Sequence, residues 1–238
     1  MTKFLVGIDG CRAGWIAVRR AATGGASEAI IARSWSEAMA RRFRMAAVDM
    51  PIGLPDSGPR LCDSEARRKL GWPRMLSVFL HLRRPLLTFD TYAPANDWAR
   101  ADGKGLSKQA WFLLPKIAEI DAWITPGRQS RLREAHPELI FQALNGGKPL
   151  TDGKKTPTGH RRRRRLLERA GFADIGTWLD RLTPAFRRGE AAPDDLLDAY
   201  ACCWTAGRLL DGTAVRLTGC GDRPSRRDGR GLVMEICY

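Results

Sequence analysis

The sequence lacks any apolar run of the roughly 18 residues that a membrane-spanning helix needs. Residues 1–3 lead directly into a strand-like run, without the apolar region or small-residue cleavage site of a signal peptide. We therefore expect no membrane partner and a cytoplasmic location. Glycine-rich nucleotide loops are missing too, because Gly7, Gly10 and Gly14 fit neither G-x-G-x-x-G nor the Walker spacing.

Cysteine and histidine also lack the spacings that carry chemistry. The 6 cysteines include no CxxC pair and no Cys/His zinc pattern. In a reducing compartment we expect thiols, with Cys202 and Cys203 as packing residues of a helix. The 3 histidines have no G-x-S-x-G partner, which argues against a Ser-His-Asp hydrolase.

What the chain does have is size, apolar content and positive charge. Its 238 residues, 44% of them hydrophobic, suffice for one large domain or for a core with an insertion. The net charge of +14 favours a polyanionic partner, of which nucleic acid is the commonest. The alternative is an arginine-rich surface that is merely solvated.

Hydrophobic periodicity predicts a mixed α/β sheet with helices on both faces, and a mostly helical insertion after the fourth strand. We expect a single domain over residues 1–238, with the insertion at about 54–130. Residues 138–141 can form either a short strand or the start of a helix, and 72–106 show little period. The predicted elements are a hairpin over 3–20, strands at 29–32, 45–50 and 231–236, and helices at 36–43, 59–70, 107–124, 161–170 and 193–210.

Four aspartates are the main candidates for chemistry. Asp9 and Asp49 each end an apolar, strand-like run, and Asp195 and Asp198 share one helix face at i, i+3. A buried carboxylate is costly unless its charge is offset, so these groups can converge on divalent cations. Two alternatives stay open: Asp9 can initiate a turn, and Asp195 can interact with the positive end of the helix macrodipole.

Four further polar residues are accessory candidates. Glu138 can add a carboxylate to the site, or it can form a partly buried ion pair with a nearby arginine. His136 can orient a water molecule. Lys154 and Lys155 can hold a phosphate in a flexible loop, or they can simply be solvated.

The arginine run at 161–165 is the strongest charge cluster. Five successive helical positions cover all sides of a helix, so they cannot all contact one partner. We expect some to pair with acids such as Glu168, and two or three to contact phosphates. The expected nucleic-acid contacts are Arg12, Arg161, Arg162 and Arg165.

Eight short motifs carry a resemblance to a known family, at 6–15, 49–55, 60–63, 66–67, 106–109, 116–121, 134–138 and 194–199. Together they resemble the uncharacterised family of predicted ribonuclease H-like nucleases, domain-of-unknown-function family 429. The similarity covers about residues 4–210. It implies a ribonuclease H-like core with the acidic arrangement of junction resolvases. One Asp then ends the first strand, an acid ends the fourth, and a final helix offers two more, which Asp9, Asp49, Asp195 and Asp198 match in order.

The resulting hypothesis is a nuclease that depends on Mg²⁺ or Mn²⁺ and hydrolyses phosphodiester bonds with little sequence preference. Asp9 would bridge two ions roughly 4 Å apart, Asp49 would ligate one, and Asp195 and Asp198 the other. One alternative is a non-catalytic nucleic-acid-binding protein on the same fold. Another is an actin-like nucleotide-binding phosphotransferase. A homodimer is a further expectation.

Overall fold

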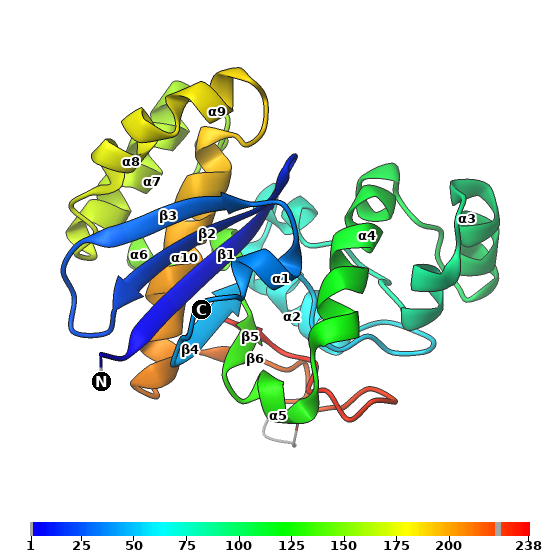
Figure 1. Cartoon of the computed structure of the whole chain (residues 1–238). Helices are drawn as coiled ribbons and strands as arrows, with labels where there is room; N and C mark the ends of the chain where they lie inside the picture. The colour runs from blue at the N-terminus through cyan, green and yellow to red at the C-terminus, as the bar shows by residue number, and fades with distance from the viewer. Residues whose placement is uncertain (1, 222–224) are drawn as a thin grey trace. The chain divides into compact units, whose positions relative to one another are not determined.

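The computed structural model describes residues 2–221 and 225–238, which form two compact units (Figure 1). The first unit contains Met1–Met50, Arg131–Val215 and Cys237–Tyr238. The second contains Pro51–Ser130 and Arg216–Ile236, so it includes the segment predicted as an insertion. A single domain over the whole chain stays a prediction.

A five-stranded mixed sheet is the centre of the first unit, with the strand order β3-β2-β1-β4-β5. The first three strands are antiparallel neighbours, β4 runs parallel to β1, and β5 runs parallel to β4. This confirms the predicted α/β class and is consistent with a ribonuclease H-like fold. The strands are β1 (Phe4–Cys11), β2 (Gly14–Ala21), β3 (Ser27–Ala32), β4 (Met45–Val48) and β5 (Leu132–Glu134).

In the first unit the long helix α10 packs on β1, β2 and β4, and α6, α7 and α8 pack against α10 (Figure 1). Residues 138–141, which were ambiguous, form part of a helix. The basic helix begins earlier than predicted, because the Thr156 hydroxyl caps it by accepting the Gly159 N–H at 3.1 Å. The helices are α1 (Trp35–Ala38), α6 (Pro137–Leu144), α7 (Pro157–Arg169), α8 (Ile175–Arg181), α9 (Thr183–Arg187) and α10 (Pro193–Leu210).

Helices cover both faces of the sheet, as predicted. Side chains alternate along a strand, so Gly10 and its cross-strand partner Trp15 face away from the side that Asp9 occupies. On that opposite face Trp15 packs edge-to-face on Trp35 of α1, with ring centroids 4.9 Å apart. The predicted helix at 36–43 is wrong in extent, since α1 ends at Ala38.

The second unit is mostly helical. The predicted helices at 59–70 and 107–124 are confirmed, and Pro115 lies inside α4 without ending it. The elements are α2 (Leu61–Leu70), the 3₁₀ helices η1 (Arg74–Ser77) and η2 (Arg84–Thr88), α3 (Tyr92–Ala101), α4 (Lys108–Trp123) and α5 (Pro126–Gln129). The short strand β6 (Arg216–Leu217) pairs with β7 (Ile236–Cys237).

The structure differs from the sequence pattern at two places in this unit. Residues 72–106, which show little hydrophobic period, contain α3, and Pro94 is tolerated there because it lies in the first helical turn, where backbone N–H groups have no intrahelical acceptor. The strand predicted at 231–236 is reduced to its last residue. Side chains bond that backbone instead: Asp228 accepts the Leu232 N–H at 2.9 Å, and Gln129 accepts the Val233 N–H at 2.8 Å.

Candidate metal centre

The pairing of β1 with β4 brings Asp9 and Asp49 to the same edge of the sheet. The strands are parallel, and Ile8 of β1 lies opposite Val48 of β4. Asp9 follows Ile8 and Asp49 follows Val48, so both aspartates lie where the paired segments of the two strands end. The Asp49 N–H continues the ladder by donating to the Ile8 carbonyl at 3.0 Å. The apolar runs therefore end side by side, although 40 positions separate the two aspartates.

A close approach of α10 to β1 brings the third aspartate. A Cβ added to Gly7 would lie 2.0 Å from the Cys203 nitrogen and 2.1 Å from the Ala199 carbonyl oxygen. Only glycine permits this contact. Gly7 shares its sheet face with Asp9, and Ala199 directly follows Asp198, so the contact places the two carboxyl groups at one end of the interface.

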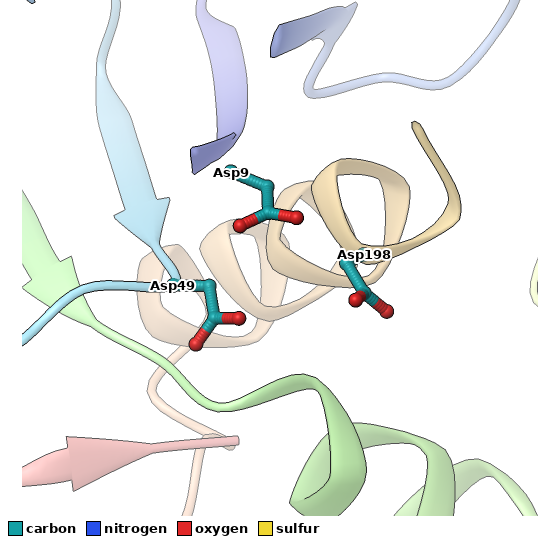
Figure 2. A group of neighbouring side chains, drawn as sticks. All are labelled: Asp9, Asp49 and Asp198. Atoms are coloured by element: carbon teal, nitrogen blue, oxygen red, sulfur yellow. The ribbon is translucent and has the colours of Figure 1, made fainter. Parts of the chain in front are cut away.

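Three carboxylates consequently form one cluster (Figure 2). Figure 2 shows them projecting from β1, from the residue after β4 and from α10. One oxygen from each of Asp9, Asp49 and Asp198 lies within 4.8 Å of the others. Asp9 is 7% exposed and Asp198 is 1% exposed, whereas Asp49 is half-buried. Water can screen the mutual repulsion of these groups only weakly.

The cluster holds its protons more tightly than ordinary carboxylic acids do. Burial, with the charges of Asp49 and Asp198, raises the pKa of Asp9 well above its usual range. Burial raises the pKa of Asp49 to about 7, partly offset by Lys154, and that of Asp198 to about 6. A cation among these oxygens would restore the charged forms.

Lys154 supplies a positive charge at one side of the cluster. Its ammonium donates to Asp198 Oδ2 at 2.7 Å and lies 3.5 Å from Asp194 Oδ2. The charges of Asp198, Asp9 and Asp49 raise the pKa of Lys154 despite its partial burial. The loop is fixed from within, since the Thr156 N–H and hydroxyl both donate to the Gly153 carbonyl. The sequence predicted neither the contact of Lys154 with Asp198 nor its proximity to Asp194.

The donor set fits a hard divalent cation. Carboxylate oxygens are the ligands that Mg²⁺ and Mn²⁺ prefer. One of them, Asp198 Oδ1, is buried and has no hydrogen-bond partner among the described residues, which is costly unless an ion or water satisfies it. Asp9 Oδ1 already accepts the Gly10 N–H at 2.7 Å, which orients that carboxylate.

Asp195, the fourth predicted ligand, lies outside this group of three. Its Oδ2 accepts the Ala192 N–H at 2.8 Å at the start of α10, as an acid at the third helical position commonly does. Burial raises its pKa to about 6. The observed contact is thus a helix cap, in line with the alternative left open by the sequence.

Glu138 forms a buried ion pair with an arginine, which is the alternative that the sequence left open for this residue. Arg163 of α7, fully buried, donates to Glu138 Oε1 at 2.6 Å. The charge of Glu138 nevertheless reaches the cluster and raises the pKa of Asp49. His136 occupies the N-cap position of α6, directly before Pro137.

The remaining basic candidates are exposed. Arg12 lies in the turn between β1 and β2, and Lys155 lies beside Lys154. On α7 the structure exposes Arg161, Arg162 and Arg165, and Arg162 donates to Asn145 Oδ1 at 3.2 Å. Arg164 pairs with Glu168 at 2.7 Å, the kind of pairing expected within the run.

Fold and site together define an α/β protein whose mixed sheet carries a buried acidic cluster at the carboxyl ends of two parallel strands. The chain belongs to the family described as "Protein of unknown function (DUF429)", whose model matches residues 7–222. No curated protein and no solved structure matches the chain.

Among the helices of the described residues, none combines the length and apolar character that crossing a membrane requires. No disulfide joins the 6 cysteines.

Proposed function

We propose that this protein is a divalent-metal-dependent nuclease that hydrolyses phosphodiester bonds of nucleic acid. The observation that carries the proposal is the convergence of Asp9, Asp49 and Asp198 from three separate elements. Their raised pKa values and the unsatisfied Asp198 Oδ1 support a site that is completed by a cation.

Different residues of the chain would bind the metal ion and the nucleic acid. Asp9, Asp49 and Asp198 would hold Mg²⁺ or Mn²⁺ through carboxylate oxygens, and their burial would limit access of bulk water. When bound, the ion would lower the pKa of an attacking water and offset charge on the phosphate. Exposed basic residues, among them Arg12, would contact the strand's phosphates and give salt-sensitive binding with little sequence preference.

An Asp9→Asn variant tests the proposal, with Asp180→Asn, an exposed acid of α8, as the matched control. We expect calorimetry to detect Mn²⁺ binding by the wild type and the control, but not by Asp9→Asn. Cleavage of duplex, junction, hybrid and single-stranded substrates should follow the same order. Cleavage by Asp9→Asn at the wild-type rate would exclude this site. Nucleic-acid binding without turnover by the wild type would indicate a non-catalytic binding protein.

A further inference from the structure

A cavity of about 410 Å³ lies where the loop before α7 meets the first turns of α7 and α10. Lys154, Lys155 and Arg161 contribute its cationic lining, and His160 and Asp194 also face it. The volume is within the roughly 300–1,000 Å³ of small-ligand sites. Its walls belong entirely to the first unit, which also holds the three carboxylates.

The charges of this lining select an anion. Three cationic side chains face one carboxylate, that of Asp194, which already lies near Lys154. Lys155 and Arg161 are exposed and form no ion pair among the described residues. A guanidinium presents paired N–H donors that match the oxygens of a phosphate, and a lysine ammonium adds a point charge.

His160 adds a polar atom that the fold leaves unsatisfied. Its Nε2 is buried and has no hydrogen-bond partner in the described part of the chain. Such an atom is normally paired with a protein group, water or a ligand. The imidazole lines the cavity, but this atom is itself buried, so the anion would be held by Lys155 and Arg161 and not by His160.

Lys154 connects the cavity with the acidic cluster. Its side chain lines the cavity, and its ammonium contacts Asp198, one of the three clustered carboxylates. A nucleic-acid strand that occupies both the cavity and the acidic cluster would present successive phosphates to groups of opposite charge. One phosphate would meet the carboxylates and their cation, and the other would meet Lys155 and Arg161.

We propose that the cavity binds a phosphate of the nucleic-acid strand adjacent to the phosphodiester that is cleaved. This inference rests on the proposed function, because it assigns the neighbouring phosphate of the same substrate. The site would position the strand, and it requires no sequence-specific contact. Arg161 and Lys155 would supply the charge for binding.

Anisotropy of a labelled single-stranded oligonucleotide, measured in EDTA, tests the site without metal. We expect Arg161→Ala and Lys155→Ala each to weaken binding about five- to tenfold and to reduce the salt dependence by about one phosphate contact. The matched control is Arg169→Ala, an exposed arginine of α7 outside the cavity lining, which should change affinity less than twofold. An equal loss in Arg169→Ala would show diffuse binding by the helix surface and would overturn the proposal.

Inorganic phosphate serves as a second probe and separates the two possible sources of the ligand. We expect it to compete with the oligonucleotide for the wild type, and Arg161→Ala to weaken it as well. If Arg161→Ala weakens inorganic phosphate but leaves oligonucleotide affinity unchanged, the cavity takes free phosphate and the proposal is wrong. Because these measurements exclude metal, Asp9→Asn should bind the oligonucleotide normally even where it has lost cleavage, which keeps the two proposals separable.

Discussion

Replacing Lys154 with methionine probes the electrostatics of the cluster most directly. Methionine keeps much of the apolar stem and removes the ammonium that bonds Asp198 at 2.7 Å. The Asp198 side chain is only 2% exposed, so its charge would lose its nearest counter-ion in a place that water barely reaches. The pKa of Asp198, already raised to about 6, would rise further, since Lys154 lowers it in the wild type.

The size of the effect follows from the burial of the two partners. Removing one partner of a fully buried ion pair costs about 3–5 kcal/mol. The Lys154 side chain is 38% exposed, so solvent screens the pair and the cost is smaller. We expect a loss of about 2 kcal/mol at pH 8, or about 4–8 °C in Tm for a protein of this size. At pH 5 the loss should shrink, because Asp198 of the variant is then protonated.

Thermal unfolding with and without Mn²⁺, together with calorimetry, measures both consequences. Mn²⁺ should bind the Lys154→Met variant about tenfold more tightly, since the cation no longer competes with an ammonium, and saturating Mn²⁺ should remove the stability deficit. Lys155→Met is the matched control, because its neighbouring ammonium does not contact the cluster. If Lys154→Met is as stable as the wild type at pH 8 and binds Mn²⁺ no more tightly, the charge balance derived for this cluster is refuted.

Three other perturbations give separate tests. Gly7→Ala places a methyl group 2.0 Å from the Cys203 nitrogen and should destabilise by more than about 3 kcal/mol in denaturant unfolding; wild-type stability would contradict the close approach. Arg163→Met leaves Glu138 buried without its partner, and chemical denaturation should show a loss of about 3–5 kcal/mol, whereas a neutral effect would mean that the pair is not buried. Burial raises the pKa of Asp49 from 3.8 to about 7, so the folded, metal-free protein binds more protons than the unfolded chain between those values. Its free energy of unfolding should therefore decline across that pH window more steeply than that of Asp49→Asn, and equal pH profiles would contradict the shift.

The sequence predicted the strands and the helix that carry the acids, because each has a strong local pattern. The run 45–48 is apolar on both faces and became an interior strand, and Pro193 opens the last helix as expected. The three-residue strand β5 has no such pattern and was missed. Its place in the sheet depends on pairing with β4, which is a tertiary contact.

Contacts between residues that are distant in the sequence could not be predicted from local patterns. Lys154 lies 44 positions from Asp198, and nothing local distinguishes it from its neighbour Lys155. The inward position of Arg163, by contrast, could be predicted from the sequence. It shares a helix face with the buried Leu166 and Leu167 at i+3 and i+4, so periodicity alone marks it as the inward member of the arginine run.

The glycine at position 7 and the aspartate at position 9 act together. Parallel pairing of β1 with β4 explains why Asp9 meets Asp49, but it does not explain Asp198, which belongs to a helix on the face of the sheet. The missing side chain of Gly7 lets the backbone of α10 approach β1 at Ala199 and Cys203. A larger residue would hold the helix away and separate Asp198 from Asp9. A small residue inside the strand, two positions before the acid, is therefore what converts a pair of strand-end carboxylates into a three-carboxylate cluster.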